Sequence, residues 1–191
     1  MHQYNNRGVM SDYKRLFLDG HYVFITCVIF KRNPILITNI EHLRNSFKKT
    51  KEKFNFEITG IVILKDHLHL LIKPENISQY PQIITMIKQF FSQNIDKSHL
   101  IKIQKYITPS MKKRNESGVW QRRYYEHTIR NEKDFNNHLD YIHYNPVKHN
   151  LVNCVKDWEF SSFHKYVKRG NYEENWGRCD DVKSIIDCDY E

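Results

Sequence analysis

Two histidines separated by one residue, His67 and His69, are the side chains of this sequence best suited to chemistry. Successive side chains of a β-strand point to opposite faces, so both imidazoles would project to the same side and could grip one divalent metal ion. Imidazole suits zinc, manganese and similar ions better than magnesium, which prefers oxygen ligands. Two histidines leave the coordination shell open, so a third ligand and substrate oxygens are needed. The pair predicts a metal ion that can polarise a phosphodiester.

A tyrosine-rich segment further along the chain supplies candidate nucleophiles. The spacing predicts a helix over 131–144. Its apolar residues fall on one side, which predicts the buried face of the helix: Phe135, Leu139 and Ile142. Tyr141 and Asn145, four residues apart, share a flanking face and could approach one point together. Tyr144 is expected to point away from the core.

The tyrosine hydroxyl needs activation, because the pKa of a phenol is about 10. His138, one turn before Tyr141, could help to move the proton. Pro146 is expected to end the helix, which would place Asn145 at a helix terminus from which its side chain could reach a metal. Helical geometry alone leaves three other tyrosines as alternative nucleophiles, Tyr124, Tyr125 and Tyr144.

Four strands and three helices are expected to position these residues. Runs rich in β-branched and aromatic residues predict strands over 22–31, 56–64, 66–72 and 119–129. Helices are predicted around the apolar stripe of Ile40, Leu43 and Phe47, over 79–94, and over 131–144. The order β-α-β-β-α-β followed by a helix predicts an α+β fold. It is a split βαβ sandwich, an antiparallel sheet with helices on one face and an added C-terminal helix that bears the tyrosines.

The third strand also predicts which way the histidines face. Leu68, Leu70 and Ile72 form its core face, so His67 and His69 project from the opposite, polar face. Residues 98–118 are polar and strongly basic, and are expected to form a mobile connection.

The composition favours a folded protein that meets nucleic acid. The chain has 191 residues, a net charge of +8 and 14% aromatic residues. Cations meet phosphates and rings stack on bases, although a merely basic protein fits the charge as well. One domain over 1–178 and an acidic tail over 179–191 are expected.

Cysteine spacing and hydropathy exclude several classes of protein. Cys27, Cys154, Cys179 and Cys188 form no C-x-x-C pair, which argues against a thiolate zinc site or a disulfide framework. No apolar run is long enough to span a bilayer, and the N-terminus carries no signal-peptide pattern. We therefore expect a cytoplasmic protein.

Three segments, taken in order, resemble one family of DNA-processing enzymes: Asp66–His69, Trp120–Arg130 and Asp140–His149. Together they resemble the REP-associated tyrosine transposases, domesticated relatives of the single-tyrosine HUH transposases of small insertion sequences. The resemblance runs from about Tyr13 to Trp176. The H-x-H pair is weak evidence alone, whereas its combination with Y-x-x-x-N-P-V-K-H is specific.

The resemblance implies a ferredoxin-like fold, a divalent metal (commonly Mg²⁺ or Mn²⁺) and cleavage of single-stranded DNA next to palindromic hairpin repeats. It also implies a bacterial, nucleoid-associated protein that acts as a monomer or a homodimer. His67 and His69 would be metal ligands, Tyr141 the nucleophile and Asn145 a third ligand. Attack by Tyr141 would leave a 5′-phosphotyrosine and a 3′-hydroxyl, and reversal would rejoin strands.

Basic residues around these segments are candidate phosphate contacts: Arg122, Arg123, Arg130, Lys148, Lys112, Lys113 and Arg114. We expect Trp120 to be a core residue and His127 to be structural or to support the site. Two other classes remain open. One is a non-catalytic binder of single-stranded RNA or DNA on a ferredoxin-like sheet. The other is a metallohydrolase that uses the histidine pair with a carboxylate such as Asp66.

Overall fold

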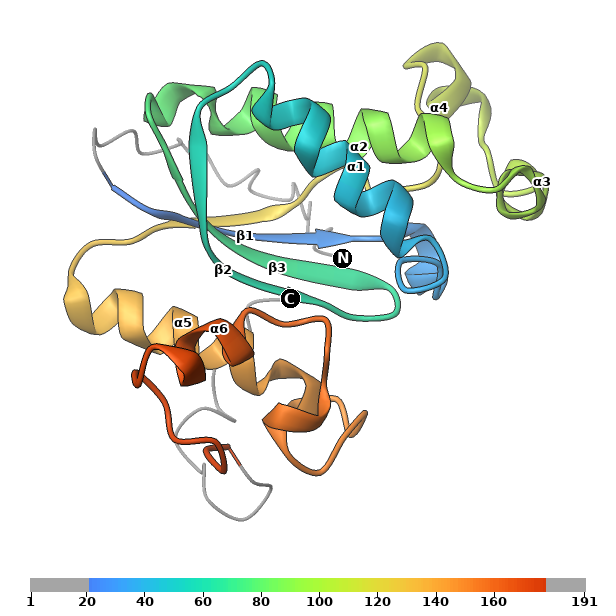
Figure 1. Ribbon diagram of the computed structural model, residues 1–191. Helices are drawn as coiled ribbons and strands as arrows, with labels where there is room; N and C mark the ends of the chain where they lie inside the picture. Colours follow the sequence, from blue (N-terminus) through green and yellow to red (C-terminus); the bar gives the residue numbers. More distant parts are fainter. Residues whose placement is uncertain (1–20, 178–191) are drawn as a thin grey trace, which may run out of the picture.

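A four-stranded antiparallel sheet in the order β2-β3-β1-β4 forms the centre of the computed structural model, which describes residues 21–177 (Figure 1). Its strands are β1 (Val23–Val28), β2 (Phe56–Ile63), β3 (His67–Pro74) and β4 (Tyr125–Thr128). β1 lies between β3 and β4, with Thr26 paired to His69 and Val28 to His67. The predicted histidine strand is therefore one of the two inner strands of the sheet.

The helices follow the predicted order, with two short additions between α2 and β4. They are α1 (Ile40–Lys51), α2 (Tyr80–Asn94), α3 (Lys97–Gln104), α4 (Pro109–Lys113), α5 (Glu132–Lys148) and α6 (Phe163–Lys168). Three 3-10 turns join them: η1 (Phe30–Arg32), η2 (Ile77–Gln79) and η3 (Val155–Asp157). Figure 1 shows α1 and α2 on one side of the sheet and α5 and α6 on the other. None of the helices in the described part is long and apolar enough to cross a membrane.

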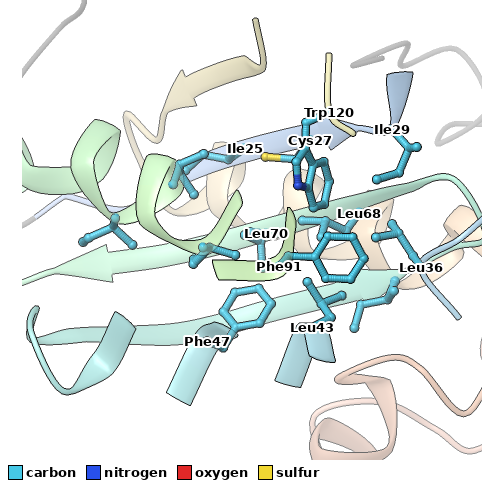
Figure 2. Packing of buried hydrophobic residues seen from close by; sticks show 14 of the residues in the cluster. Ile25, Cys27, Ile29, Leu36, Leu43, Phe47, Leu68, Leu70, Phe91 and Trp120 are labelled. Carbon is cyan, nitrogen blue, oxygen red and sulfur yellow. The ribbon is translucent and has the colours of Figure 1, made fainter. Parts of the chain in front are cut away.

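A first core cluster fills the space between the sheet and the helices α1 and α2. Leu68, Leu70 and Ile72 of β3 belong to it, together with Leu43 and Phe91 from the helices (Figure 2). This confirms that the even positions of β3 form the face toward α1 and α2. Trp120 also lies in this cluster and is a core residue, as predicted, and Cys27 lies there with it.

A second core cluster lies on the other face of the sheet, under α5. Leu139 and Ile142 of the predicted stripe pack here against Phe24 and Leu71. Gly60 of β2 lets the helix come close, because a Cβ at this position would lie 2.9 Å from Leu139 Cδ1. α5 therefore seals the face from which the histidines project.

The segment 98–118 contains two helices, α3 and α4, instead of an irregular connection. Each helix has a side-chain N-cap: Asp96 accepts from the backbone N–H of Ser98 at 2.8 Å, and Thr108 accepts from that of Met111 at 3.2 Å. The predicted strand 119–129 is also shorter than expected. Only β4 is a strand, with a single bridge between Ile29 and Trp120 before it.

α5 runs through Pro146 and ends at Lys148, so the prediction that proline ends the helix was wrong. The proline sits in the last turn, where its missing N–H removes one helical bond while later residues still close the turn. The N–H of His149 donates to the Asn145 carbonyl at 3.0 Å, and that of Leu151 donates to the Pro146 carbonyl at 2.9 Å.

The helical wheel predicted that Tyr144 points away from the core, and this prediction was wrong. It is 2% exposed and forms a third core cluster with Val147, Val155 and Phe163. The segment that follows α5 folds back and covers this side of the helix, an arrangement that helical spacing alone does not reveal. Cys179, Cys188 and the acidic tail 179–191 lie outside the described residues.

Candidate active site

The two histidines lie side by side on β3 and face α5, with their ring centroids 5.1 Å apart. His69 Nδ1 is 2.8 Å from the Thr26 hydroxyl on the neighbouring strand, and His67 Nδ1 is 2.7 Å from the Asp66 carboxylate. These bonds fix the ring orientations and make Nε2 the nitrogen that would coordinate a metal. The prediction that the histidines project from a polar face was wrong: both rings are buried, because α5 covers them.

Asp66 supports His67 from the first position before β3. Burial opposes ionisation of this carboxyl group, but the hydrogen bond from His67, its charge, and the Arg32 guanidinium outweigh that effect, so the pKa of Asp66 lies below its usual value. Arg32 Nη1 lies 3.6 Å from Asp66 Oδ2 and 3.4 Å from His67 Nδ1. Asp66 therefore orients a histidine, which differs from the ligand role considered for it in the metallohydrolase alternative.

Arg32 was not expected at the site from its sequence. It follows Lys31 in η1, and both have left-handed backbone conformations, with φ of 52° and 55°. Such strained non-glycine residues persist only where surrounding contacts hold them, and they cluster at functional sites. The N–H of Ile29, next to η1, donates to the Asp66 carbonyl at 2.8 Å, which ties this turn to the start of β3.

Tyr141 is the tyrosine that the structure brings to the histidine pair. It is 1% exposed, and its ring centroid lies 5.2 Å from that of His69. Lys148, on the same helix, donates from Nζ to the Tyr141 hydroxyl oxygen Oη at 3.3 Å.

Two of the three alternative tyrosines lie elsewhere, and Tyr125 lies at the exposed edge of the same face, where its ring contacts Phe24. Tyr144 belongs to the third core cluster, and Tyr124 packs against the first. Tyr125 is 40% exposed at the start of β4.

Asn145 follows Tyr141 by one helical turn and is fully buried. Neither its side-chain oxygen nor its nitrogen has a hydrogen-bond partner within residues 21–177. A buried amide in this state is costly, and such groups usually serve a ligand or a reaction. With the imidazoles of His67 and His69 it would form a donor set that suits a divalent transition metal. His149, at the end of α5, packs its ring 4.9 Å from that of His67, another contact that the sequence did not predict.

A second group of metal-ligating residues joins β4 to the first turns of α5. His127, Asp134 and His138 lie close enough together to hold an ion. His127 Nε2 lies 2.8 Å from Asp134 Oδ2, and His138 Nδ1 lies 3.1 Å from Oδ1. The two rings are stacked almost parallel, at 10°, and each approaches a different carboxylate oxygen of Asp134. The carboxylate of Asp134 therefore links His127 on β4 to His138 on α5 (the Asp134 link).

The charges of this link follow from its surroundings. Burial opposes ionisation of Asp134, but hydrogen bonds from His127 and from the backbone and side chain of Arg130 lower its pKa to about 2. Burial lowers the pKa of His138 and keeps its ring neutral near pH 7, despite the bond to Asp134. The proposed proton role of His138 toward Tyr141 stays a prediction, since its Nδ1 is directed to Asp134.

The candidate phosphate contacts fall into different settings. Arg114 and Arg122 share Glu116, at 2.6 and 3.8 Å, and Arg130 binds Asp134 at 3.2 Å. Three more are exposed on α4 and on the segment before β4: Lys112, Lys113 and Arg123. Lys148 alone among the seven contacts the tyrosine of the site.

Comparison with known proteins shows to which family a chain with these features belongs. A family model described as Transposase IS200 like matches residues 17–145. A REP-associated tyrosine transposase of Haemophilus influenzae is 44% identical over 176 residues, which cover 91% of this chain and 97% of the relative. The chain belongs to the REP-associated tyrosine transposases. One from Escherichia coli K12 is 36% identical over 169 residues, covering 87% of this chain and 91% of that protein.

A solved structure supports both the family and the fold. A REP-associated tyrosine transposase bound to a REP hairpin superposes with a TM-score of 0.71 and 34% identity, covering 91% of this chain and 96% of the other. The resemblance drawn from the sequence is thus confirmed, and so is the α+β fold. Tyrosine transposases cleave and rejoin DNA, and membership of this family implies a divalent metal.

Proposed function

We propose that this REP-associated tyrosine transposase is a metal-dependent endonuclease and strand transferase that acts on single-stranded DNA at hairpin-forming palindromic repeats. The observation that carries the proposal is the contact of Tyr141 with both His69 and Lys148 on a buried face of the sheet. A relative with 34% identity binds a REP hairpin, which supports a hairpin as the substrate.

His67, His69 and Asn145 would hold the metal through the two Nε2 atoms and the amide oxygen. When bound, the ion supplies Lewis acidity that polarises the scissile phosphate. Two imidazole ligands favour Mn²⁺ over Mg²⁺, because Mg²⁺ prefers oxygen and gives up water reluctantly. Asp66 and Thr26 hold the two rings by their Nδ1 atoms, so the protein fixes the donors before substrate arrives.

Tyr141 would act as the nucleophile. Its Oη attacks the scissile phosphorus, the Oη–P bond forms and the P–O3′ bond breaks, which leaves a 5′-phosphotyrosine and a 3′-hydroxyl. The phenolic proton passes to a base or to solvent, and the departing 3′ oxygen takes up a proton. Attack by another 3′-hydroxyl on the phosphotyrosine reverses these changes and joins strands.

Exposed basic residues on α4 and beside β4 would contact the DNA backbone: Lys112, Lys113, Arg114, Arg122, Arg123 and Arg130. Such contacts give affinity without sequence readout and weaken as salt rises.

A labelled single strand with a hairpin tests the proposal in the presence of Mg²⁺ or Mn²⁺. Denaturing electrophoresis should show a covalent adduct with the unaltered protein and none with Tyr141→Phe. Tyr144→Phe is the matched control, because Tyr144 lies on the same helix but outside the site, and it should retain the adduct. An adduct with Tyr141→Phe would refute the assignment of the nucleophile. A gel shift without an adduct would favour the non-catalytic binder, and cleavage without an adduct would favour a hydrolase.

A further inference from the structure

The contact between Lys148 and Tyr141 depends on the unexpected length of α5. The two residues are seven positions apart, about two helical turns, so they lie on the same face of the helix. If the helix ended at Pro146, Lys148 would have no fixed relation to that face. Its Nζ lies 3.3 Å from Tyr141 Oη and 4.9 Å from the ring centroid. The fold thus places a cation at the reacting atom of the proposed nucleophile.

The position of this cation can be related to the phosphate that Tyr141 would attack. A phosphorus atom ready for attack lies about 3–3.5 Å from the nucleophilic oxygen. An ammonium group 3.3 Å from the same oxygen is therefore beside the phosphate, within reach of one of its non-bridging oxygens. Negative charge gathers on these oxygens in the transition state, where a fixed positive charge stabilises it most.

We propose that Lys148 is a catalytic residue that binds a non-bridging oxygen of the scissile phosphate during attack by Tyr141. Attack occurs in line, with the departing 3′ oxygen opposite Oη, so Lys148 stands on the tyrosine side of the phosphorus. When strands are rejoined, the Oη–P bond breaks and Lys148 stabilises the charge that develops on Oη. The Lys148 ammonium group transfers no proton in either direction. The bonds that change are the ones at phosphorus: Oη–P forms and P–O3′ breaks during cleavage, and the reverse occurs during rejoining. This inference rests on the proposed role of Tyr141.

A simpler role for Lys148 is packing, because an ammonium group over a tyrosine ring stabilises a fold by itself. Packing and phosphate binding differ in one respect: only phosphate binding makes the effect of the lysine depend on the charge of the scissile phosphate. The experiment therefore combines changes in the protein with a change in the DNA.

The protein variants are Lys148→Met, Lys148→Arg and Lys133→Met. The last is the matched control, since Lys133 is exposed in the first turn of the same helix. Adduct formation in a single turnover at saturating DNA should slow about 100-fold in Lys148→Met, the usual cost of losing one transition-state contact. Lys148→Arg should recover part of the rate, and Lys133→Met should leave it unchanged. An unchanged rate in Lys148→Met would overturn the proposal.

The second arm measures DNA binding in proteins that also carry Tyr141→Phe, so that it does not require chemistry. A neutral methylphosphonate replaces the scissile phosphate, or the next phosphate as a control. It should weaken binding when Lys148 is present and have a smaller effect in Lys148→Met. An equal penalty with and without the lysine, or no binding at all, would overturn the proposal. Absence of an adduct with the unaltered protein would instead refute the role of Tyr141, and the binding comparison would then decide the phosphate contact alone.

Discussion

Replacing Asp134 with asparagine should destabilise the protein in a way that depends on pH. In the folded protein the pKa of this carboxyl group is lowered from 3.8 to about 2, because hydrogen bonds from His127 and Arg130 outweigh the opposing effect of burial. At about 1.4 kcal/mol per pKa unit, the lowering corresponds to about 2–3 kcal/mol of stability. A carboxyl group with a lowered pKa contributes this stability in full above its unfolded value of 3.8. The contribution is lost as pH falls through about 2.

Urea denaturation at several pH values measures this difference directly. The gap in unfolding free energy between the unaltered protein and Asp134→Asn should be constant between pH 7 and 5, then narrow below about pH 4. Asp157→Asn, which alters an exposed carboxylate in η3, should leave the unfolding free energy nearly unchanged at every pH. A gap that does not change with pH, or no gap at pH 7, would refute the electrostatic account of the link. A chelator that destabilises the unaltered protein but not Asp134→Asn would show that the cluster holds a metal instead.

Two further predictions concern the proposed metal ligands. Asp66→Asn should weaken Mn²⁺ binding about 10- to 100-fold in calorimetry, since it removes the charged partner of His67, whereas Thr26→Val should cost less because His69 loses only a neutral partner. Equal Mn²⁺ affinity in Asp66→Asn and the unaltered protein would contradict this role. Asn145→Ala should stabilise the metal-free protein by about 1–3 kcal/mol in urea denaturation, because it removes a buried amide without partners, yet weaken Mn²⁺ binding. Destabilisation without metal would argue that the amide is structural.

The sequence predicted correctly which side chains share a face of a strand, because the two-residue alternation of a strand alone determines this. Strand alternation placed Leu68, Leu70 and Ile72 on one face and both histidines on the other, as found. It could not show that this second face is buried. That fact depends on α5 packing against β2 and β3, which is a contact between segments far apart in the chain.

The same distinction explains the errors on α5. The helical wheel found the stripe that packs on the sheet, but Tyr144 is buried by residues that follow the helix. Pro146 was treated as a stop signal because proline disfavours the helical conformation in the residue before it, whereas packing in the third core cluster holds the last turn. Arg32 and His149 were missed because no spacing rule connects them to His67. They reach it through the turn after β1 and the end of α5.

The arrangement of α5 gives a reason for the spacing of Tyr141, Asn145 and Lys148. Steps of four and three residues repeat one face of a helix, so the proposed nucleophile, third ligand and phosphate contact form one rigid unit. The two histidines belong to a second unit, the sheet. The distance between the proposed nucleophile and the proposed metal ligands therefore depends on the position of α5 relative to β3. The close approach at Gly60 and the Asp134 link to β4 both fix this position. A change at either contact should therefore slow cleavage without touching a residue of the site, because catalysis tolerates little displacement between the two units.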